Sequence, residues 1–172
     1  LSRGYGASGT SYSIHLIASH MKRVLIVEDD EYKLNGLVSA IRGLTRDIDI
    51  VTAMSFTTAV HLLKRQCFDL VVLDMSLPTF DATDAQAGGD AQGFGGRRIV
   101  RIAEEYGNSS PTILVTQFTV YEDLGESLTV GDLSTQIHEQ LGEYFVGTVA
   151  YDRSSQDWIP VYQELVQKAL SI

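Results

Sequence analysis

The chain has 172 residues and a formal net charge of −9, with 44% hydrophobic and 20% charged residues. This length suits one well-formed core and is too short for two ordinary domains. The acidic balance argues against nucleic acid or an anionic membrane as the main partner, because both would repel the chain on average. The single cysteine excludes an internal disulfide, and no stretch approaches the roughly 18 apolar residues of a transmembrane helix, so we expect a cytoplasmic protein.

The first segment, residues 1–20, is rich in Gly and Ser and lacks the apolar centre and basic start of a signal peptide. His20 followed by Met21 is typical of a cloning junction. We therefore interpret residues 1–20 as a cloning-derived or disordered N-terminal segment and residues 21–172 as a single domain.

From Met21 onward, short apolar runs alternate with segments of helical spacing. In chain order, the runs predicted to be strands are RVLIV (23–27), DIDIV (47–51), FDLVVLD (68–74), PTILVTQ (111–117) and YFVGTVAY (144–151). The helices predicted between and after them cover residues 34–44, 56–63, 97–107, 133–141 and 156–170. Asp30 is expected to cap the first helix and Ser55 the second.

Strands that are apolar throughout and alternate with helices predict an α/β fold, in which a parallel sheet is covered on both faces. Ligands of such sheets bind beyond the carboxyl ends of the strands. Glu28 and Asp29 end the first strand, Asp74 ends the third and Thr116 ends the fourth. Any one of these acids alone would be read as a helix cap or a solvated loop residue, but together they predict one polar rim.

Three carboxylates at one rim repel one another, so some of them must take up a proton or acquire a cation. Mg²⁺ suits such a cluster because it takes few protein ligands and leaves positions for phosphate oxygens. A carboxylate beside that ion is a competent nucleophile toward a phosphoryl group, which predicts an aspartyl phosphate at Asp74. The Thr116 hydroxyl could then donate a hydrogen bond to the phosphoryl oxygens.

Three motifs in order, VLIVEDDE (24–31), LVVLDMSLP (70–78) and TILVTQ (112–117), resemble the receiver domain of bacterial two-component response regulators. The resemblance spans about residues 22–171. It implies a flavodoxin-like (βα)5 fold, a doubly wound parallel sheet with strand order 2-1-3-4-5. It also implies signal transduction by a phosphoprotein.

Carried over by motif, the resemblance makes Asp74 the phospho-acceptor. It implies that Asp29, Asp74 and the backbone carbonyl of Ser76 hold Mg²⁺ directly and that Glu28 holds it through water. Thr116 matches the switch residue that contacts the phosphoryl group.

The sequence departs from the family at the end of the fifth strand, where a lysine is usual and Tyr151 stands here. No lysine occurs between residues 65 and 167. A tyrosine hydroxyl brings no positive charge, and the loss of one fixed charge from a phosphoryl site can cost on the order of several kcal/mol of stabilisation. Arg153 is the candidate substitute cation, although a solvated loop arginine is the favoured interpretation. The aromatic three residues earlier is also replaced, by Thr148.

Two connections are longer than the family pattern, at about residues 79–95 and 118–143. The first is acidic and Gly-rich, which favours a flexible loop or lid over a calcium loop, because the spacing of its aspartates does not match. The second lies beside the surface through which receivers usually signal, so we expect an unusual output surface.

Three functions compete. The leading one is a stand-alone receiver that takes a phosphoryl group from a histidine kinase or another phosphodonor protein and signals to a downstream protein target. It is not an enzyme beyond self-phosphorylation and autodephosphorylation of Asp74, and homodimerisation is left open. The alternative is a phosphorylation-independent receiver that acts as an interaction module. A Mg²⁺-dependent phosphohydrolase ranks last. Phosphohydrolases of the haloacid dehalogenase type also start from a strand-end aspartate, but that family has a second aspartate two residues later as acid and base, and Ser76 stands there in this chain.

Overall fold

The computed structural model describes residues 21–78, 91–92, 95–107, 109–117, 120–123 and 126–172. The N-terminal segment 1–20 and most of the predicted loop at 79–95 lie outside these residues. Within the described part of the chain, no helix is both long and apolar enough to cross a membrane.

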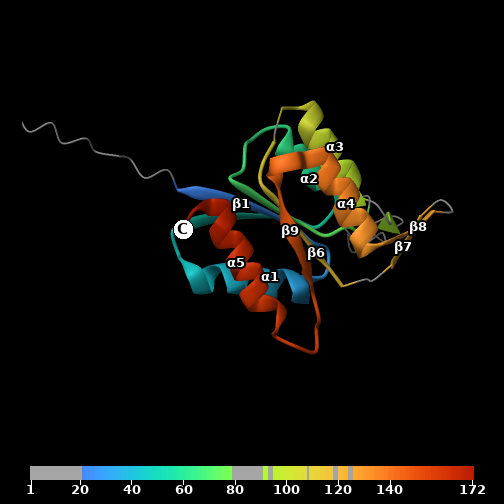
Figure 1. Cartoon of the computed structure of the whole chain (residues 1–172). Coiled ribbons are helices and arrows are strands. Elements are labelled where there is room, and N and C mark those ends of the chain that lie inside the picture. The colour runs from blue at the N-terminus through green and yellow to red at the C-terminus, as the bar shows by residue number, and fades with distance from the viewer. Residues whose placement is uncertain (1–20, 79–90, 93–94, 108, 118–119, 124–125) are drawn as a thin grey trace, which may run out of the picture.

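A five-stranded parallel sheet forms the centre of the fold (Figure 1). Its strands, in spatial order, are β2 (Ile48–Ala53), β1 (Lys22–Val27), β3 (Leu70–Leu73), β6 (Thr112–Thr116) and β9 (Phe145–Ala150). Counted along the chain, these are strands two, one, three, four and five. The predicted flavodoxin-like topology is therefore confirmed.

Two helical layers cover the sheet. Helices α1 (Glu31–Leu44) and α5 (Trp158–Leu170) pack on one face, and α2 (Phe56–Leu63), α3 (Gly95–Glu105) and α4 (Val130–Leu141) pack on the other (Figure 1). Strand β1 shows why its sequence is apolar throughout: Leu25 and Val27 join the core under α2, α3 and α4, while Val24 and Ile26 join the core under α1 and α5.

The expected helix caps are present. Asp30 precedes α1, and its side chain accepts a hydrogen bond from the backbone N–H of Lys33 (3.0 Å). Ser55 precedes α2 and accepts one from the backbone N–H of Thr58 (3.2 Å). Both caps satisfy amide groups that have no partner within the first helical turn.

Two antiparallel pairs lie outside the central sheet. Strand β4 (Leu77–Pro78) pairs with β5 (Ala91–Gln92), with Pro78 opposite Ala91. Strands β7 (Val120–Asp123) and β8 (Glu126–Thr129) form a hairpin that leads into α4, followed by a short 3₁₀ helix (Gly142–Tyr144). The expanded region at 118–143 therefore contains a hairpin as well as the predicted helix.

Tyr162 on α5 is fully buried, and its hydroxyl has no hydrogen-bond partner among the described residues. Burial raises the pKa of this phenol, so it stays neutral. A buried hydroxyl without a partner costs free energy. We expect Tyr162→Phe to raise the free energy of unfolding by about 1 kcal/mol in urea denaturation. A clear loss of stability would show that the hydroxyl has a partner.

Candidate functional site

An acidic cluster lies at the carboxyl edge of the sheet. Glu28 and Asp29 follow β1 directly, and Asp74 follows β3. The two strands pair in parallel with Val27 opposite Leu73, so the residues that follow them are neighbours. Carboxylate oxygens of the three acids lie within 4.8 Å of one another. The side chains of Glu28 and Asp74 are buried, whereas Asp29 is exposed at the mouth of the cluster.

Backbone hydrogen bonds hold these strand ends in place. The N–H of Glu28 donates to the carbonyl of Ala53 (2.9 Å), and the N–H of Asp74 donates to the carbonyl of Val27 (3.0 Å). The hydrogen bonds of the sheet therefore continue to these acidic residues and fix the position of their backbone.

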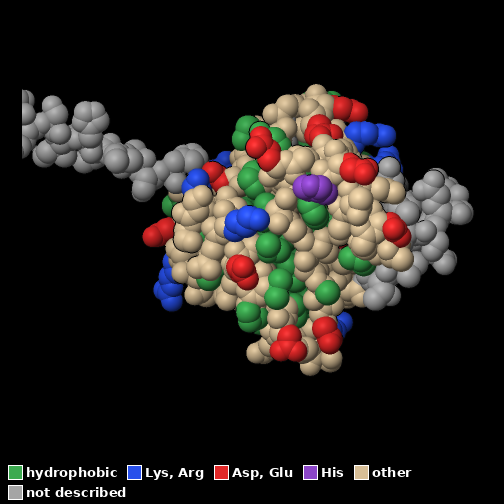
Figure 2. Space-filling model, in the orientation of Figure 1, with side chains coloured by type: hydrophobic (Ala, Val, Ile, Leu, Met, Phe, Trp, Pro, Cys, Tyr) green, Lys and Arg blue, Asp and Glu red, His purple; other side chains and the backbone are tan. Residues whose placement is uncertain are grey.

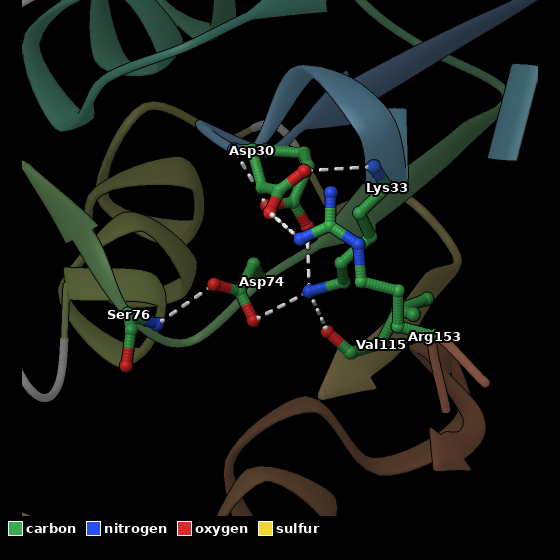
Figure 3. Close-up of polar contacts among 7 residues, drawn as sticks. Asp30, Lys33, Asp74, Ser76, Val115 and Arg153 are labelled. Atoms are coloured by element: carbon green, nitrogen blue, oxygen red, sulfur yellow. Dashed lines mark hydrogen bonds and ion pairs between the residues drawn. The ribbon is translucent and has the colours of Figure 1, made fainter. Parts of the chain in front are cut away.

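Lys33 enters this cluster from the first turn of α1 (Figure 3). Its Nζ lies 2.6 Å from Oε2 of Glu28 and 3.1 Å from Oδ1 of Asp74, and it donates a hydrogen bond to the backbone carbonyl of Val115 (3.1 Å). The residue is only 1% exposed. The buried ammonium therefore makes one hydrogen bond and lies in ion-pair contact with two carboxylates, which offset its charge.

The buried charges shift one another's pKa values. Burial raises the pKa of Glu28, the negative charge of Asp74 adds to that rise, and Lys33 lowers the pKa in part; with all these effects together it lies at about 7. Burial also raises the pKa of Asp74, against the opposing charge of Lys33. Burial alone would lower the pKa of Lys33, but the two carboxylates outweigh that effect and raise it. Lys33 is therefore a permanent cation in the cluster.

The loop after β3 is packed closely against the start of α3. The N–H of Ser76 donates to Oδ2 of Asp74 (3.3 Å), and the N–H of Gly96 donates to the carbonyl of Met75 (3.2 Å). A Cβ at Gly96 would lie 2.6 Å from the carbonyl oxygen of Asp74. Only glycine fits there without a shift of backbone, so this contact sets the position of the Asp74 segment.

The other predicted rim residues, Thr116 and Tyr151, lie at the ends of neighbouring strands. Thr116 is buried at the end of β6, and its carbonyl accepts a hydrogen bond from the N–H of Tyr151 (2.8 Å), just after β9. The ring of Tyr151 packs against Trp158, with 5.0 Å between ring centroids. The same ring lies 5.7 Å from Nζ of Lys33. The position where the family resemblance implies a lysine thus holds an aromatic ring that faces an ammonium.

Arg153 lies on the outer rim of the cluster. One guanidinium nitrogen is 3.6 Å from Oδ2 of Asp30, and the guanidinium lies over the ring of Tyr32 at 4.3 Å. Its side chain is 62% exposed, and such pairs contribute little. Among the described residues, the cation in contact with Asp74 is Lys33, which was not predicted from the sequence.

A signal for Lys33 was present in the sequence. Lys33, Leu37 and Ile41 follow one another at four-residue steps, and all three are buried. A lysine on the apolar face of a helix, in the turn that follows an acidic pair, is typical of a side chain that reaches a buried carboxylate.

The cluster suits a hard divalent cation such as Mg²⁺. Asp29 at the mouth and Oδ2 of Asp74 are oxygen donors, which Mg²⁺ prefers. With Lys33 paired to Glu28 and to the other oxygen of Asp74, the three acids and one ammonium still leave an excess of negative charge. That excess favours a further cation.

Solved structures share this fold. The chain matches the receiver domain of a sensor histidine kinase from Pseudomonas aeruginosa PAO1, which has a magnesium ion in its active-site cleft, at TM-score 0.55 and 20% identity, covering 89% of this chain and 100% of that one. It matches the phosphorylated cyanobacterial phytochrome response regulator RcpA at TM-score 0.61 and 15% identity, covering 88% and 96%. A CheY-like receiver domain from Methanospirillum hungatei matches at TM-score 0.57 and 13% identity, covering 87% and 94%. The protein therefore has the fold of a receiver domain.

A likeness in sequence supports the same class. The chain is 26% identical over 138 residues to the Detocs response regulatory protein DtcB from Enterobacter cloacae (strain JD6301), covering 79% of this chain and 92% of that protein. No protein-family model matches the chain. In fold and in sequence, the protein resembles the receiver domains of response regulators.

Proposed function

We propose that the protein is a receiver that accepts a phosphoryl group on Asp74, with Mg²⁺, from a histidine kinase or another phosphodonor protein. One observation carries the proposal: the Asp74 carboxylate lies at a strand end beside two further acids and a buried ammonium. In the reaction, an oxygen of Asp74 bonds to the phosphorus of the donor. The bond from phosphorus to the leaving group breaks, and the leaving group keeps the electron pair.

The metal ligands proposed are Asp29, Asp74 and the backbone carbonyl of Ser76, with Glu28 acting through water. A bound Mg²⁺ supplies positive charge for the phosphoryl oxygens and helps to orient them. The close contact of Gly96 with Asp74 holds the acceptor segment in place during transfer. The hydroxyl of Thr116 is proposed to bind a phosphoryl oxygen.

Signalling is proposed to occur through protein contacts at the face formed by α4, β9 and α5. Strand β9 is an edge strand of the sheet, and most of its residues are only partly buried. Figure 2 shows hydrophobic side chains in a band over β9, with charged side chains of both signs dispersed around it. The hydroxyls of Ser134 on α4 and Thr148 on β9 lie 2.8 Å apart. A shift at Thr116, which pairs with β9, can therefore reach α4.

The proposal is tested by incubating the protein with Mg²⁺ and acetyl phosphate and recording the intact mass. We expect one phosphoryl adduct, located by peptide mapping to the segment that contains Asp74, and its loss when EDTA is added beforehand. Tight Mg²⁺ binding without any adduct from acetyl phosphate, phosphoramidate or a kinase would refute phosphorylation and favour the interaction module.

Mg²⁺ binding is expected to depend on pH. Burial raises the pKa of Glu28 to about 7, so this carboxyl carries a proton at lower pH and must release it to attract the metal. The affinity for Mg²⁺ should therefore rise between about pH 6 and pH 8, as measured by isothermal titration calorimetry. Glu28→Gln should flatten this dependence. An affinity that does not change with pH would show that Glu28 is ionised throughout.

A further inference from the structure

We propose that Lys33 supplies the positive charge at the phospho-acceptor that other receivers obtain from a lysine at the end of the last strand, an inference that rests on the proposed function. In this protein the positive charge comes from the first turn of α1 and not from the end of the last strand, where Tyr151 stands. Lys33 thereby becomes a catalytic residue of phosphoryl transfer to Asp74.

The position of the ammonium supports this exchange. Nζ of Lys33 contacts Glu28, which follows β1. It also contacts Asp74, which follows β3, and the carbonyl of Val115 on β6 (Figure 3). Its contact with Asp74 is direct, at 3.1 Å. The other candidate, Arg153, is 62% exposed on the rim, where its guanidinium lies 3.6 Å from Asp30.

Tyr151 complements this arrangement. The centroid of its ring lies 5.7 Å from Nζ of Lys33, and the ring also packs against Trp158. An aromatic ring attracts a nearby cation and shields it from water. A lysine at position 151 would instead bring a second ammonium toward the first and repel it. The tyrosine at 151 and the lysine at 33 are therefore compatible as a pair.

The charge balance of the reaction gives Lys33 its role. With acetyl phosphate, an Asp74 oxygen forms the new bond to phosphorus, the phosphorus bond to acetate breaks, and acetate leaves with the electron pair; no proton is transferred. The side chain at 74 passes from one negative charge to two, beside Glu28 and Asp29. A fixed ammonium in contact with Asp74 offsets that added charge without having to be bound from solution.

The same charge competes with Mg²⁺. Lys33 occupies Oδ1 of Asp74 and Oε2 of Glu28, two oxygens of the cluster that would otherwise attract the metal. Removing the ammonium should therefore tighten Mg²⁺ binding while it slows phosphoryl transfer. A residue that only supports the fold would not move these two quantities in opposite directions.

The test compares Lys33→Met, Lys33→Met/Tyr151→Lys and the wild-type protein in phosphorylation by acetyl phosphate and in Mg²⁺ titration. Lys33→Met should slow adduct formation about 10- to 100-fold and tighten Mg²⁺ binding about 10-fold. The double variant returns an ammonium from the family's usual position and should recover most of the rate. Lys168→Met, the same change at an exposed site on α5, should leave both quantities unchanged.

An unchanged rate and an unchanged Mg²⁺ affinity in Lys33→Met would overturn the inference, as would failure of Tyr151→Lys to restore the rate in that background. Circular dichroism checks that each variant folds. If Lys33→Met does not fold, Lys33→Gln removes the charge but keeps hydrogen-bond donors, and it carries the same expectations. If the wild-type protein forms no adduct, the proposed function fails and the catalytic role of Lys33 fails with it. The Mg²⁺ titrations would still show separately whether Lys33 sets the charge of the cluster.

Discussion

Asp74→Asn is expected to abolish the phosphoryl adduct, with a loss of at least about 100-fold in the rate of its formation. The amide has nearly the shape of the carboxylate, so its contacts with Ser76 and Lys33 can be kept in part. Its oxygen is a far weaker nucleophile than a carboxylate oxygen, and the substitution also removes one negative charge that would attract Mg²⁺. The measurement is intact mass after incubation with Mg²⁺ and acetyl phosphate.

Asp47→Asn is the matched control, because Asp47 is exposed and lies in the turn before β2, outside the acidic cluster. It should be phosphorylated at the wild-type rate. An adduct that persists in Asp74→Asn would mean that another carboxylate accepts the phosphoryl group, and peptide mapping would then identify it. An equal loss in the control would point to a general effect of charge on the protein.

Of the substitutions proposed for this protein, Lys33→Met, which removes the buried ammonium, is expected to lower the free energy of unfolding most. Without Mg²⁺ at pH 8, Lys33→Met should lower the free energy of unfolding by about 3 to 5 kcal/mol, because Glu28 and Asp74 remain buried without their cation. Urea denaturation measures the change. Adding Mg²⁺ should restore part of the loss, since the metal binds the folded state.

A double-variant cycle separates this charge effect from packing. Glu28→Gln/Lys33→Met should be clearly more stable than the sum of the two single changes predicts, because it leaves one uncompensated acid fewer.

The free energy of unfolding is expected to fall as pH rises. The pKa of Glu28 is raised in the folded state to about 7, so the folded state binds the extra proton between its ordinary pKa and that value, and stability falls as pH rises through this window. In Lys33→Met the fall should be steeper, and a loss of stability that is the same at pH 6 and pH 8 would contradict this account.

The buried ion cluster is not by itself a device for stability. Taking three charged groups out of water costs free energy that their attraction only partly returns. The acids can bind a metal ion at this edge of the sheet because the parallel strands end there and Asp29 is exposed to solvent. A lysine that keeps Asp74 and Glu28 together in the absence of metal gives the apo protein a defined acceptor geometry.

The sequence by itself determined the layers of the fold. Uninterrupted apolar runs such as LVVL at 70–73 predict strands buried on both faces, and the spacing of Leu34, Leu37 and Ile41 predicts a helix with one buried face. Because parallel strands end at a common edge, the same reasoning predicted that Glu28, Asp29 and Asp74 would lie together.

Only the tertiary structure decided which cation meets Asp74. Lys33 is separated from Asp74 by 41 positions in the chain (74 − 33), and the two meet because α1 packs beside the sheet with its first turn over the strand ends. Arg153 was nearer to the expected position in sequence, yet its side chain lies exposed on the rim beside Asp30. The hairpin of β7 and β8 was also absent from the predicted elements, since four-residue strands carry too few residues for a clear period of alternation. Local patterns specify which face of an element is buried; the point that a long side chain reaches depends on how the elements pack, and that is set by contacts distant in sequence.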